Sequence, residues 1–179
     1  MVSKEILIEK VNKIKFLITD VDGVLTDTGV YYNSHGEELK RFSIRDGMGV
    51  ERLKQSADIE TGIITGENSL IVSRRAEKLQ IRELHLGIKN KFDVFEKLCQ
   101  RRNLQPEEIA YIGDDINDME VLMLVGLSAC PNDGMKCIKD IVDYITDHNG
   151  GHGAFRDFCE LIISMKSNRG YYGNNKVWK

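Results

Sequence analysis

The stretch Lys15-Phe-Leu-Ile-Thr-Asp-Val-Asp-Gly-Val-Leu-Thr-Asp27 decides how the rest of the chain is interpreted. Its apolar run, residues 16–18, predicts a buried strand, and Gly23 predicts a turn directly after it. The strand delivers two carboxylates, Asp20 and Asp22, to the same loop. Alternate residues leaving a strand point the same way, so both side chains can converge on one cation or substrate. An isolated pair of this kind is equally typical of a solvated turn. The rest of the sequence must therefore distinguish a functional site from an ordinary turn.

The rest of the chain predicts one insertion followed by alternating helices and strands. Aromatic and β-branched residues on both sides of Asn33-Ser-His-Gly36 predict a β-hairpin over about residues 29–43, directly after the first turn. From Asp46 onward, short links between apolar strands and amphipathic helices predict parallel βα units. We therefore expect an α/β fold with a doubly wound, Rossmann-like parallel sheet. The length of 179 residues predicts one domain over 1–166 and a flexible tail over 167–179.

Composition and charge exclude several classes of function. The formal net charge is −3 and the basic residues are scattered, which predicts no nucleic-acid partner. No apolar run approaches membrane-spanning length, and the first residues lack the order of a secretory signal. The four cysteines form no C-x-x-C pair, which predicts free thiols in a reducing compartment. We expect a cytoplasmic protein with no membrane partner.

Four polar features share one position, because each lies where a predicted strand ends or a helix begins. They are Asp20 with Asp22, Thr65-Gly66, Lys91, and Gly113-Asp-Asp-Ile-Asn-Asp118. Such loops line the ligand crevice of an open α/β sheet, so residues distant in sequence become neighbours. Each feature alone has an ordinary explanation as a strand-end turn, a solvated lysine or a helix cap. Together, and in this order, they predict one active site.

The acidic residues among these features predict a magnesium site. Hard cations prefer oxygen ligands, and Mg²⁺ in particular takes an octahedral set that retains some water. The acid cluster after the strand at 109–113, together with the first acid pair, supplies enough oxygen ligands for such a cation. The expected ligands are Asp20, Asp22, Asp114, Asp115 and Asp118.

Phosphate-ester chemistry suits this combination of groups. The hydroxyl of Thr65 and the backbone at Gly66 can bind an anion, and Lys91 adds positive charge at a helix start. These groups and the cation offset the repulsion between a phosphate dianion and a carboxylate nucleophile. We predict that Asp20 attacks phosphorus to form an aspartyl-phosphate. Asp22 would first protonate the leaving alcohol and then activate water.

These residues resemble the four motifs of the haloacid dehalogenase superfamily of phosphatases. The motifs are Asp20-Val-Asp22-Gly, Thr65-Gly, Lys91 and Gly-Asp114-Asp115-x-x-Asp118. Further segments resemble the capless subfamily of this superfamily, which acts on phosphorylated 3-deoxy-2-ulosonic acids. They are the hairpin, Ile44-Arg-Asp-Gly-Met-Gly, Tyr-Ile-Gly-Asp-Asp and Gly150-Gly-His-Gly-Ala-Phe-Arg156. The resemblance covers nearly the whole chain. It implies a magnesium-dependent phosphoric monoester hydrolase that acts on a phosphorylated 2-keto-3-deoxy sugar acid.

The subfamily contains enzymes for eight-carbon octulosonate 8-phosphate, which implies lipopolysaccharide biosynthesis, and for nine-carbon ketodeoxynononate or acylneuraminate 9-phosphates, which implies sialic acid biosynthesis. Thr65-Gly66-Glu67 followed by Arg75 and Lys78 is more similar to the nine-carbon enzymes, since the eight-carbon enzymes commonly lack an acid at the Glu67 position. Arg75 and Lys78 could hold the substrate carboxylate, or could simply belong to an exposed helix face. Ser43-Ile-Arg45-Asp-Gly, with Arg45 also expected to bind substrate, resembles the eight-carbon group equally well. We expect a nine-carbon 9-phosphate, with the eight-carbon 8-phosphate as the alternative.

The resemblance also implies a homotetramer in which the hairpins build a central barrel and a neighbour closes each active site. A hairpin that acts as a local flap on a monomer is the alternative. Two other functional classes are a phosphorelay receiver domain and a non-catalytic oligomerisation module. A receiver would need a strand-end aspartate between the acid pair and Thr65, and none is evident. Decayed motifs would indicate the non-catalytic module, whereas every catalytic position here is filled.

Overall fold

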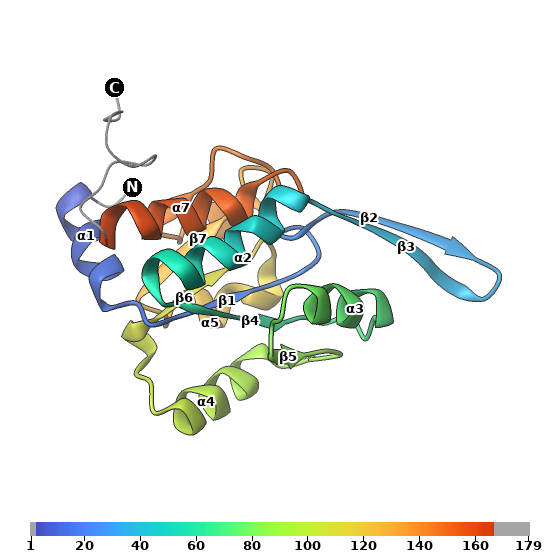
Figure 1. Cartoon of the computed structure of the whole chain (residues 1–179), viewed down its shortest axis with the longest axis horizontal. Helices are drawn as coiled ribbons and strands as arrows, with labels where there is room; N and C mark the ends of the chain where they lie inside the picture. Colours follow the sequence, from blue (N-terminus) through green and yellow to red (C-terminus); the bar gives the residue numbers. More distant parts are fainter. Residues whose placement is uncertain (1–2, 167–179) are drawn as a thin grey trace.

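The centre of the molecule is a six-stranded parallel sheet with the order β5-β4-β1-β6-β7-β8 (Figure 1). The computed structural model describes residues 3–166. The chain winds from β1 through β4 to one edge of the sheet, and then from β6 to the other edge. This order confirms the predicted doubly wound α/β fold. The strands are β1 Phe16–Thr19, β4 Glu60–Ile64, β5 Glu83–His85, β6 Ile109–Ile112, β7 Leu127–Cys130 and β8 Tyr144–Ile145.

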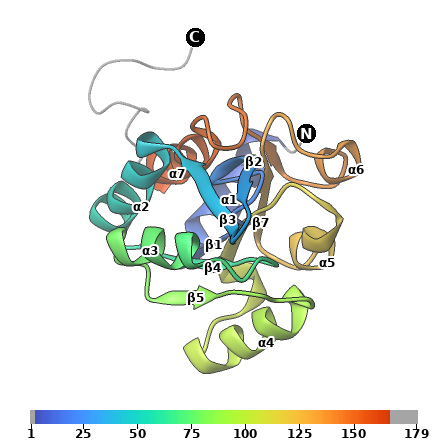
Figure 2. The ribbon, with the colours of Figure 1, turned by 90° about the vertical axis from the view of Figure 1, so that its right-hand side faces the viewer.

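Helices cover both faces of this sheet (Figure 2). One face packs against α1 Lys4–Lys13, α2 Ile44–Ala57, α3 Leu70–Lys78 and α7 Ala154–Lys166. The other packs against α4 Lys91–Arg102, α5 Met119–Leu122 and α6 Lys136–Lys139, while Pro106–Glu108 and Ile116–Asp118 form short 3₁₀ turns. None of the helices within residues 3–166 combines the length and the apolarity needed to cross a membrane. The tail predicted over 167–179 lies outside the described residues.

Strand β1 is held by the core on both of its faces. Leu17 packs in the layer that contains α2 and α7, whereas Phe16 and Ile18 pack in the layer that contains α4 and α5. A strand buried on both sides is expected to be apolar without alternation, as this one is. Its neighbours β4 and β6 pair with it along its whole length. The end of β1, where the loop with Asp20 and Asp22 begins, is therefore held rigidly in the core.

The predicted hairpin forms a separate two-stranded antiparallel sheet that projects beyond the parallel sheet (Figure 1). It consists of β2 Thr26–Asn33 and β3 Gly36–Phe42, so it begins three residues earlier than the expected position 29. Thr26 already pairs with Phe42, close to the turn after β1. The register shifts between Thr26 and Val30 and again between Tyr31 and Tyr32, which bends the hairpin. Its base therefore lies beside the end of β1.

Candidate active site

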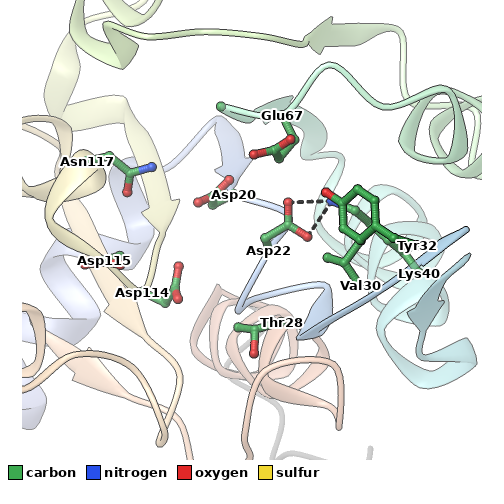
Figure 3. Close-up of a pocket in the computed structure, with 11 residues that line it drawn as sticks. Asp20, Asp22, Thr28, Val30, Tyr32, Lys40, Glu67, Asp114, Asp115 and Asn117 are labelled. Carbon is green, nitrogen blue, oxygen red and sulfur yellow. Dashed lines mark hydrogen bonds and ion pairs between the residues drawn. The ribbon is translucent and has the colours of Figure 1, made fainter. Parts of the chain in front are cut away.

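A cavity of about 300 Å³ lies beyond the carboxyl ends of β1 and β6 (Figure 3). These strands are adjacent at the point where the winding of the sheet reverses, which is where open α/β sheets bind ligands. The lining residues come from the loops after β1, β4 and β6 and from the hairpin. They are Asp20, Asp22, Thr28, Val30, Tyr32, Lys40, Gly66, Glu67, Asp114, Asp115 and Asn117.

The floor of the cavity contains a buried lysine between two carboxylates. Lys91 Nζ lies 2.7 Å from Asp20 Oδ2 and 2.6 Å from Asp118 Oδ1. Lys91 is the first residue of α4, and the Asn90 side chain caps this helix by accepting two backbone N–H groups. The exposed fractions of Asp20, Lys91 and Asp118 are 4%, 2% and 0%. Ionic groups this deeply buried need partners, and each of the three has them.

Asp118 is tied to the floor by further hydrogen bonds. The hydroxyl of Tyr111, a fully buried residue of β6, donates to Asp118 Oδ1 at 2.5 Å. The backbone N–H of Asp114 donates to Asp118 Oδ2 at 3.2 Å. Most of the accepting capacity of the Asp118 carboxylate is therefore used within the protein. Asp118 orients both Lys91 and the loop that carries Asp114.

Burial and the excess of negative charge at the floor raise the pKa values of three groups at this site, Asp20, Asp114 and Lys91, although burial alone would lower that of Lys91. Burial, together with the nearby Asp118 carboxylate, raises the pKa of Asp20 well above its usual value. Burial and the carboxylates of Asp118 and Asp115 raise the pKa of Asp114 to about 7. Burial alone would lower the pKa of Lys91, but Asp20 and Asp118 outweigh it and raise this pKa. A bound divalent cation would favour the ionised acids and so reverse these upward shifts.

The acids at the floor fit a magnesium ion. Asp20, Asp114 and Asp118 each offer an oxygen atom, and these atoms lie within 4.8 Å of one another. Asp114 can approach because Gly23 has a left-handed φ of 85° and no side chain. A Cβ atom on Gly23 would lie 1.9 Å from Asp114 Oδ2. An all-oxygen set with excess negative charge is the type that Mg²⁺ prefers.

The two other predicted metal ligands also line the cavity but make different contacts. The Asp115 side chain accepts the N–H of Ile116 at 2.7 Å and caps the turn that follows β6. Both carboxylate oxygens of Asp22 lie 2.8 Å from Lys40 Nζ (Figure 3), and one accepts from Thr26 Oγ1 at 3.2 Å. The structure thus brings all five predicted acids to one site, and three of them are close enough to share a cation.

The predicted anion-binding turn lies directly after β4. Thr65 is buried, and its backbone N–H donates to His85 O at 3.0 Å. Its hydroxyl oxygen accepts the N–H of Glu67 at 3.3 Å, which tightens the turn. Gly66 and Glu67 line the cavity as a result, and Glu67 points toward Asp20 and Asp22 (Figure 3).

Three predicted substrate-binding residues lie outside the cavity of their own chain. Arg75 donates to the backbone oxygen of Ser43 at 2.7 Å and lies over the ring of Phe42, with 5.5 Å to the centroid. Lys78 lines a different cavity between α2 and α3, and Arg45 is exposed in the first turn of α2. The expected role of these residues in substrate binding stays a prediction that requires a neighbouring chain.

The sequence did not predict six residues of the site: Tyr111, Lys40 and the lining residues Thr28, Val30, Tyr32 and Asn117. Tyr111 supports Asp118 from β6, and the one available signal was a hydroxyl within the otherwise apolar strand Ile109–Ile112. Lys40 contacts Asp22 from β3, where strand alternation places it opposite Val30. Nothing local to Lys40 in the sequence identifies Asp22 as its partner. The contact depends on how the hairpin returns toward the end of β1.

Comparison with known proteins identifies the class that this fold and site define. Residues 31–156 match the family model of haloacid dehalogenase-like hydrolases. The chain belongs to this family, which confirms the predicted superfamily and separates the chain from receiver domains. The expected class of enzyme, a phosphoric monoester hydrolase, is that of its curated relatives.

Particular relatives share most of their length with this chain. The 3-deoxy-D-manno-octulosonate 8-phosphate phosphatase KdsC of Escherichia coli (strain K12) is 41% identical over 157 residues, which cover 88% of this chain and 83% of the relative. The crystal structure of 3-deoxy-D-manno-octulosonate 8-phosphate phosphatase from Yersinia pestis has a TM-score of 0.87 and 38% identity, covering 91% of this chain and 88% of that one. The corresponding enzyme from Moraxella catarrhalis, in complex with a magnesium ion, a phosphate ion and a KDO molecule, has a TM-score of 0.88 and 36% identity over 93% and 95%. These relatives are named for the eight-carbon substrate, so they give the expected nine-carbon preference no support.

Proposed function

We propose that the chain is a magnesium-dependent phosphatase that removes the terminal phosphate of 3-deoxy-D-manno-octulosonate 8-phosphate. The observation that carries the phosphatase chemistry is the convergence of Asp20, Asp114 and Lys91 at the reversal point of the sheet. The identity of 41% to a phosphatase of this specificity supports the choice of substrate. The match extends over 88% of the chain.

Asp20 is placed to act as the nucleophile. Its Oδ1 accepts the N–H of Val21 at 2.7 Å and its Oδ2 contacts Lys91, so the carboxylate has one orientation at the cavity. One of its oxygen atoms would form a bond to phosphorus while the bond from phosphorus to the sugar oxygen breaks. When bound, Mg²⁺ would offset the negative charge of the phosphate and the carboxylates. Lys91 favours the ionised form of Asp20, against the effect of burial, and orients the carboxylate for the attack.

Asp22 is placed to move the proton in both halves of the reaction. Its carboxylate lies at the cavity beside the hairpin and is more exposed than that of Asp20. It would donate a proton to the sugar oxygen as this group leaves. It would then take a proton from the water that attacks the aspartyl-phosphate, which releases inorganic phosphate and restores Asp20. One carboxylate thus serves as the acid and then as the base.

The hairpin supplies the wall against which the sugar would lie. Thr28, Val30 and Tyr32 are alternate residues of β2, and all three line the cavity. A strand presents alternate side chains on one face, so these residues form a single surface. A hydroxyl, an aliphatic group and an aromatic ring suit a polyhydroxylated substrate that also has apolar C–H faces.

We further propose that the hairpin mediates assembly into a homotetramer with shared active sites. Tyr31 and Leu39 pair across the hairpin and have exposed fractions of 64% and 57%. Ile44 and Leu70, at the starts of α2 and α3, are also exposed. Apolar groups gathered in this way are typical of a protein interface. Light scattering that finds a monomer at assay concentration would reject the shared-site proposal.

A side-by-side assay tests the proposed substrate. Phosphate release would be measured with octulosonate 8-phosphate, ketodeoxynononate 9-phosphate and N-acetylneuraminate 9-phosphate, each with and without Mg²⁺. We expect the highest kcat/KM with the 8-phosphate and no turnover without the cation. A higher kcat/KM on a 9-phosphate would overturn the eight-carbon proposal and favour the alternative that Glu67 suggests. The Asp20→Asn protein controls for contaminating phosphatases.

A further inference from the structure

Lys40 makes the closest contact between the hairpin and the acid of the site. Its Nζ atom lies 2.8 Å from both oxygens of Asp22, and its side chain is only 1% exposed (Figure 3). Its next carboxylate, on Glu37, is 3.9 Å away, and Glu37 in turn accepts a hydrogen bond from Ser69. Lys91, the other lysine of the site, contacts Asp20 and Asp118 instead of Asp22.

The hairpin holds Asp22 from two directions. Thr26, the first residue of β2, donates to Asp22 Oδ1, while Lys40 on β3 contacts both oxygens from the side. Thr26 pairs with Phe42, and Lys40 pairs with Val30, so both contacts depend on the register of the same two strands. Two contacts from different directions fix the orientation of the Asp22 carboxylate. Without them, the short loop after β1 would leave this carboxylate free to rotate.

We propose that Lys40 is a positioning residue that orients the Asp22 carboxylate for proton transfer to the leaving sugar oxygen. A general acid is effective only within hydrogen-bond reach of the atom that it protonates. A displacement of about 1 Å at such a group can cost about 10²-fold in rate. The hairpin therefore contributes to the chemical step in addition to forming a wall of the cavity. This inference rests on the proposed role of Asp22.

The dependence of the rate on the leaving group distinguishes a role of Lys40 in positioning Asp22 from a role in stabilising the hairpin alone. A sugar alkoxide is a poor leaving group and needs a proton, whereas p-nitrophenolate leaves without one. We expect Lys40→Met to lower kcat on the sugar-acid phosphate about 10²-fold. The rate of the p-nitrophenolate burst should change less than about threefold, because that step needs no acid. Lys40→Arg, whose guanidinium can also contact both oxygens, should restore part of the lost kcat.

Arg41→Met provides the matched control for a loosened hairpin. Arg41 points to the other face of β3, where it contacts Asp27 at 2.7 Å and donates to Gly151 O at 3.1 Å. Its loss should weaken the anchoring of the hairpin without removing either contact to Asp22. We expect Arg41→Met to change the rates on both substrates by the same factor. Lys40→Met must alter the ratio of the two rates if Lys40 positions the acid.

A double-mutant cycle completes the test. If Lys40 acts through Asp22, Lys40→Met should lower kcat less than about twofold further in an Asp22→Asn protein. Equal losses on both phosphates, full additivity in the cycle, or a raised KM with unchanged kcat would each overturn the proposal. The wild-type rate on octulosonate 8-phosphate reports separately on the proposed substrate. If another sugar-acid phosphate is hydrolysed faster, that compound replaces it in the same comparison.

Discussion

Two lysine–carboxylate contacts support this site, and they differ in what holds them. Lys91 contacts Asp20 and Asp118, and all three side chains are buried between the sheet and α4. Lys40 is equally buried, but its partner Asp22 has a side chain that is 27% exposed and lies against the projecting hairpin. The first contact is enclosed by the packed body of the fold. The second depends on a two-stranded sheet that the core does not enclose.

This difference matches the two tasks that we propose for the acids. A nucleophile attacks one phosphorus atom from one direction, and a rigid floor suits it. A proton shuttle must face the leaving oxygen first and a water molecule afterwards, so it benefits from a support that can adjust. The comparison predicts that substitutions at the floor affect both the free energy of unfolding and the rate of hydrolysis of every substrate. Substitutions at the hairpin should instead affect only selected steps of the reaction.

The largest effect is expected for Asp20→Asn. The amide cannot form the aspartyl-phosphate, so phosphate release should fall by at least about 10⁴-fold on every substrate. Since burial and Asp118 disfavour the ionised form of Asp20, the neutral amide should leave the free energy of unfolding unchanged or raised in the absence of Mg²⁺. Malachite-green assays and urea titration measure the two quantities. Normal turnover in this variant would reject the mechanism.

A comparison of Lys91→Met with Lys40→Met tests the contrast between floor and hairpin directly. Lys91→Met leaves two buried carboxylates without their cation, which should lower the free energy of unfolding by about 3–5 kcal/mol. Lys40→Met leaves one partly exposed carboxylate that water can solvate, so its loss should be about 1 kcal/mol or less. Denaturant midpoints of the two proteins provide the measurement. Equal losses would remove the distinction that we draw.

Magnesium stabilisation should depend on pH through Asp114. Its pKa of about 7 lies above the ordinary value of 3.8, so the metal-free folded protein keeps a proton that the unfolded chain has lost between these values. The contribution of this group to stability therefore falls as pH rises from about 4 to 7. Magnesium needs the ionised carboxylate, so its affinity should rise about tenfold per pH unit and level off above pH 7. Melting temperatures with and without Mg²⁺ at pH 5 to 8 should diverge, and a constant difference would contradict the prediction.

The smallest effect is expected at the variable part of the cavity wall. Glu67→Ala should change the ratio of kcat/KM between nine- and eight-carbon phosphates by about tenfold, because Glu67 faces the cavity without belonging to the floor. Lys78→Ala should change the same ratio only if a neighbouring chain brings Lys78 to the site. Glu77→Gln, on the exposed face of α3, is the matched control. An unchanged ratio in both alanine variants would remove them from the specificity argument.

Strand-end residues could be predicted from the sequence because the topology of the fold determines their positions. Once β1, β4 and β6 are recognised as parallel neighbours, Asp20, Thr65 and Asp114 must emerge at the same edge of the sheet. Lys91 follows for a related reason, since it opens the helix after β5. For these residues, the order of the strands and helices is enough to predict where they lie, without any information on side-chain contacts.

Contacts between elements could not be predicted in this way. Lys40, which pairs with Val30, meets Asp22 from β3, and the pattern of residues does not specify the irregular register of this hairpin. Within this chain the Arg75 guanidinium donates to the carbonyl of Ser43, a contact that the pattern of residues also does not specify, while its expected role at the substrate stays a prediction. In both cases the deciding quantity is the relative placement of two elements, and local propensities carry no information about it.

The close approach of Gly23 and Asp114 has a consequence for the order of events during folding. A Cβ on Gly23 would overlap Asp114, and a Cβ on Gly150 would lie 1.9 Å from Gly23 O, so three loops from distant parts of the chain interlock. Such contacts have high sequence separation and form only when most of the sheet has assembled. We therefore expect the acids of the cation site to come together late in folding. We expect Mg²⁺ to slow unfolding in stopped-flow experiments while leaving the refolding rate almost unchanged.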